Sequence, residues 1–69
     1  PTNLYYQALN EYYYTLYSGY KNSGNYTKAM HYAKLINNKY TTSRIRREKR
    51  RFYRKHIKLW LQSLFSSQN

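Results

Sequence analysis

The stretch RIRREKRRFYRKHIKLWLQSLF, Arg44 to Phe65, changes character halfway along its length. Nine of its first fifteen residues are Lys or Arg, whereas its last seven residues are mostly apolar. Thr42 or Ser43 can cap its start, and the chain's one Pro is residue 1. The stretch therefore predicts a long, continuous helix from about Arg44 to Ser66, with a basic half and an apolar half.

Two apolar faces follow when this helix is advanced by about 100° per residue. One face needs only the two shorter helices of the same chain to cover it, so the second face predicts another partner, most simply a second copy of the chain. The alternative is that the two shorter helices cover both faces within one chain. One face holds Tyr53, Ile57, Trp60, Leu61 and Leu64, extended by Phe65, and the other holds Ile45, Phe52, His56 and Leu59. The predicted dimer contacts are Trp60, Leu61, Leu64 and Phe65.

The basic half of the helix carries a continuous stripe of cations. Glu48 is the one acid among them, whereas a helix that is merely solvated usually mixes Glu with its Lys and Arg. Guanidinium groups also suit the geometry of phosphate. The sequence therefore predicts a phosphate-binding surface. Its candidate DNA contacts are Arg44, Arg46, Arg47, Lys49, Arg50, Arg51, Tyr53, Arg54, Lys55 and Lys58.

The charge of the whole chain favours the same partner. Thirteen basic and two acidic residues in 69 give a net charge of +11. Such an excess costs self-repulsion and indicates a polyanion. We expect binding to single- and double-stranded DNA through phosphates without sequence preference. The alternatives are a peripheral module on anionic membranes and a module that docks an acidic protein.

The rest of the chain predicts two shorter helices and one domain, residues 1–69, of the all-α class. The first runs over residues 3–18 with Gly19 as its end, and the second over 26–37 with Asn25 or Thr27 as its cap. The apolar spacing gives core faces with Tyr5, Leu9, Tyr12, Leu16 and Tyr20 on the first helix, and Tyr26, Ala29, Met30, Ala33 and Ile36 on the second.

Several classes of function are disfavoured. The sequence has no Cys and two isolated His, His31 and His56, so it predicts no metal site, no cofactor and no enzyme. No apolar run approaches the roughly 20 residues of a membrane-spanning helix, and we expect the chain itself to be soluble. The eleven Tyr serve either packing at half-exposed positions or stacking on bases.

The segment IKLWLQS, Ile57 to Ser63, resembles the end of the homeodomain recognition helix, IKIWFQN. Ser63 stands where that pattern has the Asn that reads adenine, so the resemblance implies the helical fold more than base reading.

The whole Tyr-rich, basic chain is also similar to the C-terminal domain of the membrane-bound replication organisers of small protein-primed Bacillus phages. That resemblance implies three homeodomain-related helices in each chain and a closely packed or intertwined six-helix dimer. It further implies higher multimers on DNA and contact with the phage terminal protein. It places the full-length protein on the cytoplasmic side of the host membrane, held there by segments outside this sequence.

Overall fold

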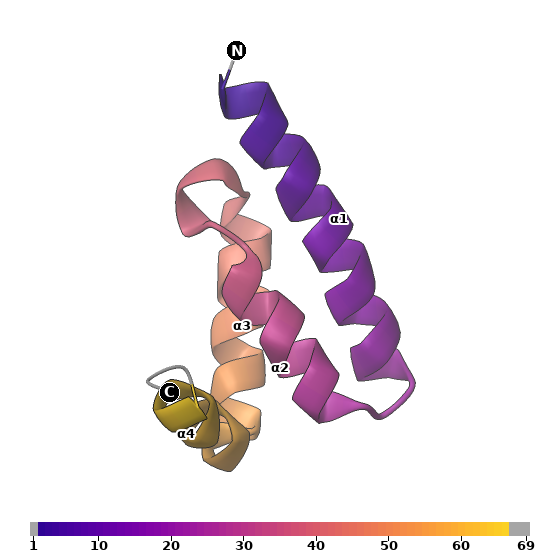
Figure 1. Cartoon of the computed structure of the whole chain (residues 1–69), viewed down its shortest axis with the longest axis vertical. Coiled ribbons are helices and arrows are strands. Elements are labelled where there is room, and N and C mark those ends of the chain that lie inside the picture. The colour runs from indigo at the N-terminus through magenta and orange to yellow at the C-terminus, as the bar shows by residue number, and fades with distance from the viewer. Residues whose placement is uncertain (1, 67–69) are drawn as a thin grey trace.

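The computed structural model describes residues 2–66, and this part of the chain is helical without strands. It consists of α1 (Thr2–Asn22), α2 (Tyr26–Leu35), the short 3-10 helix η1 (Asn38–Tyr40), α3 (Ser43–Lys55) and α4 (Ile57–Ser66). The all-α class is confirmed. Figure 1 shows α1 and α2 as an antiparallel pair, and α4 turned across the end of the molecule at which α1 leads into α2.

The first helix is longer than predicted. It continues through Gly19 to Asn22, and the chain turns at Gly24, whose φ of 84° lies in the left-handed region that favours glycine. The predicted stop at Gly19 is therefore wrong, because the ordinary helical conformation continues there and the turn uses the second Gly. The helix α2 begins as predicted, since the Asn25 side chain accepts a hydrogen bond from the Lys28 N–H at 3.2 Å.

The largest correction concerns the third helix, which is broken at His56 into α3 and α4. His56 has φ −121° and ψ 48°; its N–H donates to the Phe52 carbonyl and its own carbonyl accepts from Trp60. Its ring stacks on Tyr26, with centroids 4.3 Å apart, and contacts Phe52 at 4.7 Å. The turn brings α4 against α2, whereas a straight helix would carry its apolar end into water. The predicted count of three helices is not confirmed, and faces reckoned along one straight helix do not continue across the break.

The core lies where α1, α2 and α3 meet. Its buried members are Tyr17, Ala29, Met30, Ala33 and Phe52, with Ile36 also buried. The predicted core face of α2 is confirmed for Ala29, Met30, Ala33 and Ile36, while Tyr26 is partly exposed. On α1 the prediction fails for Tyr5 and Tyr12, which are 64% and 60% exposed. The buried side chains of α1 are instead Asn10 and Tyr17, so the face that α1 turns toward the core differs from the predicted one.

A polar pair, buried on the Asn10 side, fixes α1 to the segment that follows α2. The side-chain amide of Asn10 donates to the Asn37 carbonyl, and the Asn37 N–H donates back to the Asn10 side-chain oxygen, both at 2.9 Å. These two bonds satisfy backbone groups of Asn37 where the chain has left the helix. They hold the connection to α3 in place, so they help to orient the basic helix.

Candidate nucleic-acid interface

Five cations on the outside of α3 form the candidate interface, and we call them the outer cations. All five are exposed, and none forms an ion pair within residues 2–66. Several are four residues apart, a spacing at which like charges destabilise a helix by about 0.2–0.5 kcal/mol per pair. Across residues 2–66 no ion pair offsets this repulsion. The outer cations are Arg47, Arg50, Arg51, Arg54 and Lys55.

Glu48, the acid of this helix, is used inside the fold. Its carboxylate accepts a hydrogen bond from the Tyr14 hydroxyl at 3.1 Å and lies 3.6 Å from the Lys21 ammonium. The guanidinium of Arg44, one turn earlier in α3, lies 3.9 Å from the Glu48 carboxylate, and the Arg44 side chain is largely exposed. Glu48 thus joins α1 to α3 and partly offsets the charge of Arg44, and within residues 2–66 it forms no ion pair with an outer cation.

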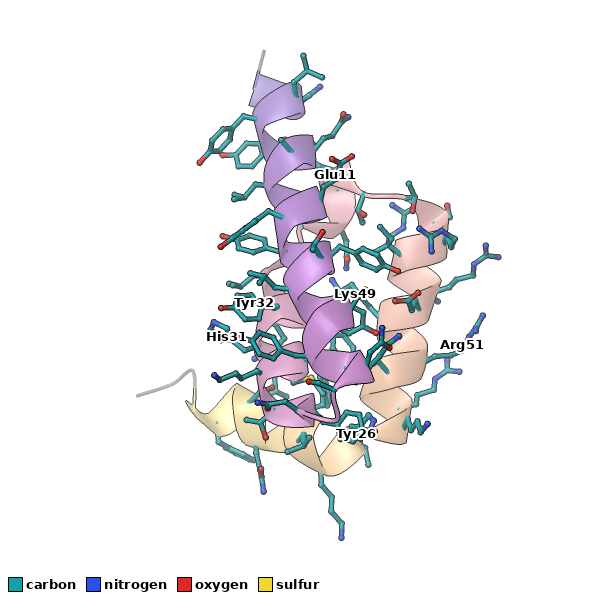
Figure 2. All side chains as sticks on the ribbon, turned by 90° about the vertical axis from the view of Figure 1, so that its right-hand side faces the viewer. Glu11, Tyr26, His31, Tyr32, Lys49 and Arg51 are labelled. Carbon is teal, nitrogen blue, oxygen red and sulfur yellow. The ribbon has the colours of Figure 1, made fainter. Side chains whose placement is uncertain are left out.

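The structure places Lys49, one of the predicted DNA contacts, inside the fold and not on the outer face of α3. Lys49 is only 5% exposed, and its ammonium donates to the Ile36 carbonyl at 3.0 Å and to the Asn38 side-chain oxygen at 2.7 Å. Burial lowers the pKa of Lys49 below its usual value. Figure 2 shows Lys49 on the side of α3 that faces the other helices, while Arg51 points away from them. The ammonium of Lys49 is therefore engaged inside the fold, which argues against a phosphate contact at this residue.

Arg46 has a similar internal role. One guanidinium nitrogen donates to the Thr41 carbonyl at 2.8 Å and to the Asn38 carbonyl at 3.0 Å, and the other donates to the Ser43 hydroxyl. Together with Lys49 it holds residues 36–43, which carry few backbone hydrogen bonds of their own. The start of α3 is capped by Thr42, whose hydroxyl accepts from the Ile45 N–H, as predicted. Most of the donors of Arg46 are thereby engaged, which reduces its value as a DNA contact.

Two further predicted contacts lie apart from the outer cations. Tyr53 is half-buried against the core beside Trp60, with ring centroids 6.3 Å apart, and burial raises the pKa of Tyr53 to about 12. Little of its ring is open to a base. Lys58 is exposed, but it belongs to α4, beyond the break.

The lysines of α1, α2 and η1 are largely engaged with the fold. Lys28 and Lys39 lie over the rings of Tyr20 and Tyr40, and Lys34 donates to the Ser63 carbonyl. These contacts hold the three ammonium groups against the fold without supplying a negative charge, whereas the outer cations of α3 form a continuous exposed stripe.

The other helices described in residues 2–66 leave the apolar face of α4 largely exposed. Ile57, Leu61, Leu64 and Phe65 are all exposed, with Phe65 at 69%. The predicted dimer residues are therefore brought together with one exception, since Trp60 packs partly against the core. Next to this face, α2 and α4 border a hollow of about 590 Å³ whose wall includes Met30, Leu35 and Leu59. The alternative prediction, that the other helices cover both apolar faces, does not hold for these four residues.

No metal or membrane feature accompanies this surface in the part of the chain that the structure describes. No cluster of three or more His, Cys, Asp or Glu occurs there that could hold a metal ion. None of the helices across residues 2–66 combines the length and the apolar character needed to cross a bilayer. Comparison of the chain with protein-family models, with curated proteins and with solved structures gave no match.

Proposed function

We propose that this chain binds nucleic acid through phosphate groups, without sequence preference, with the outer cations of α3 as the main contacts. The observation that carries this proposal is that none of them pairs with an acid in the described part of the chain. A phosphate chain would supply the missing counter-charge and relieve the repulsion between neighbouring Arg side chains. The outer face of α3 offers Arg and Lys and no Asn or Gln with which to read bases. Both single- and double-stranded DNA therefore fit as ligands.

We further propose that two chains associate through the apolar face of α4. Within residues 57–66 the sequence has one cation, Lys58, and no acid, so two chains of +11 can approach there with little repulsion. The four exposed apolar residues would leave water on contact, and the hollow beside α2 can receive part of the partner's side chains. A dimer would carry 2 × 11, or +22, and hold two sets of outer cations on one ligand.

The biological setting comes from the resemblance to the phage replication organisers. On that basis we propose that the domain assembles on phage DNA during replication and contacts the terminal protein. Segments outside this sequence would hold it at the membrane. This part of the proposal depends on the resemblance alone, whereas nucleic-acid binding and self-association are argued from the charges and exposed faces described above.

Fluorescence anisotropy with unrelated duplexes and single strands tests the binding proposal. Among duplexes of equal length, and separately among single strands of equal length, we expect similar affinities for different sequences. We also expect a steep fall in affinity with salt, with a slope of log affinity against log salt close to 0.9 per duplex phosphate neutralised. A strong preference for one duplex over its scrambled version at equal salt would reject the proposal. Anionic vesicles and an acidic polypeptide, used as competitors, cover the alternatives. If either is bound while DNA is not, the outer cations serve that partner instead.

A further inference from the structure

A second, smaller hollow lies at the end of the molecule where the α1–α2 turn meets α3. It has a volume of about 330 Å³ and is distinct from the apolar hollow beside α4. Figure 2 shows Tyr26 at this end, just after the turn and close to α3. The wall combines aromatic rings with cations from both α1 and α3. The residues that matter here are Lys21, Tyr26, Arg51, Phe52, Lys55 and His56.

The aromatic wall is already ordered. Tyr26 stacks on His56 with centroids 4.3 Å apart and planes 27° apart, and His56 rests on Phe52 at 4.7 Å. Tyr26 is the first residue of α2, and Asn25 caps that helix, so its backbone is fixed as well. Even so, 39% of Tyr26 stays exposed. A ring held on one side and open to solvent is the arrangement on which an unpaired base stacks at little entropic cost.

Three cations line the same hollow as these rings. Arg51 and Lys55 belong to the outer cations, so the hollow opens directly onto the proposed phosphate surface. Lys21 contributes from α1 and lies over the Tyr17 ring at 5.1 Å. Glu48 also lines the hollow and would oppose an anion, but Lys21 is 3.6 Å from its carboxylate and compensates it. Three cations against one acid leave the lining positive.

From this geometry we infer that the hollow is a binding site for one unpaired nucleotide of a single strand. The base stacks on Tyr26, and the flanking phosphates contact Arg51 and Lys55. A paired base inside a duplex has both faces covered by its neighbours, so it cannot enter. The inference rests on the proposed nucleic-acid binding and deepens it, because it gives the surface a preference for single-stranded segments that charge alone does not supply.

The decisive variant is Tyr26→Leu, which removes the ring but keeps an apolar side chain. The matched control is Tyr12→Leu, since Tyr12 is also exposed but lies on α1, away from the hollow. Affinities for a single-stranded oligothymidylate and for a duplex are measured at the same salt concentration. We expect Tyr26→Leu to weaken single-strand binding by about 5-fold or more, as loss of base stacking does, and to leave duplex binding within about 2-fold. Tyr12→Leu should change neither.

Equal loss for both ligands would overturn the inference, as would no loss for either. If the unchanged protein binds neither ligand, the proposed function fails first, and this result is distinct from failure of the hollow alone. A second measurement does not depend on a variant. Irradiation of the unchanged protein with a single strand that contains 5-iodouracil should crosslink the peptide that contains Tyr26 or His56. Crosslinks confined to other aromatic residues would refute the assignment even if Tyr26→Leu failed to fold.

Discussion

Adjacent residues Lys49 and Arg50 provide the sharpest test of how α3 divides its cations. We replace each with Met, which removes the charge and keeps an unbranched side chain. Lys49→Met deletes two hydrogen bonds and leaves the Ile36 carbonyl without this donor, while Asn38 is exposed and can turn to water. An unsatisfied buried acceptor costs about 1–3 kcal/mol, and relief from burying a charge offsets part of that cost. We expect a net loss of about 1–2 kcal/mol in the free energy of unfolding.

Arg50→Met should behave in the opposite way. Arg50 is exposed and lies four residues from both Arg46 and Arg54, so its removal relieves up to two repulsive pairs of about 0.2–0.5 kcal/mol each. We expect unchanged or slightly higher stability. Removal of one phosphate contact should reduce the slope of log affinity against log salt by about 0.9 on duplex DNA. Lys49→Met should leave that slope unchanged.

Urea unfolding at one fixed protein concentration, combined with anisotropy over a salt series, measures both quantities. The concentration must be held constant because self-association would add to the apparent stability. A reduced salt slope in Lys49→Met together with unchanged stability would show that the Lys49 ammonium faces solvent, and the separation of α3 into inner and outer cations would be refuted.

Three further outcomes test other parts of the structure. Leu61→Asp places a charge on the exposed face of α4 and should shift the chain to monomer in sedimentation equilibrium, and an unchanged mass would argue against this face as the contact. Burial, with the Glu48 carboxylate second, raises the pKa of Tyr17 above its usual 10.0, so the folded state holds this proton more tightly than the unfolded state does. Stability should therefore fall as the pH rises above about 10, and Tyr17→Phe should move that fall to higher pH in a circular dichroism titration. Asn10→Leu removes both hydrogen bonds to Asn37 and should lower the free energy of unfolding in urea by about 1–3 kcal/mol. The control Glu11→Gln, at the exposed neighbouring residue, should have a far smaller effect.

Local signals in the sequence predict the caps and the class of fold well. Asn25 and Thr42 cap α2 and α3, each being one of the two candidates that the sequence offered, because a side-chain oxygen that accepts from the third helical N–H is a local interaction. The break at His56 is different. It depends on Tyr26, which is thirty residues earlier in the chain, and on the packing of α4 against α2. No residue between Lys55 and Lys58 is a helix breaker, so the local sequence gives no reason to end α3 there.

The burial of Lys49 could have been recognised from spacing. Ile45, Lys49, Phe52 and His56 follow one another at intervals of four, three and four, which places Lys49 in the middle of an apolar stripe. A prediction made from the charge of Lys49 alone overlooks this position within the apolar stripe. The partial exposure of Tyr26 could not be predicted in the same way. Its helical spacing fits a core position, and the same spacing also fits a ring that packs on His56 with one side and stays open to solvent on the other.

The break at His56 also separates the two proposed activities in space. On one straight helix, the outer cations and the exposed apolar residues would overlap in direction, and a partner chain on Leu61 would crowd the ligand on Arg50. In the folded chain α4 runs across the end of the molecule at a wide angle to α3 (Figure 2), so the two surfaces belong to different helices. A second copy can cover the apolar face of α4 while the outer face of α3 stays open. Self-association and phosphate binding can then reinforce each other, because each added chain contributes cations without hiding those already present.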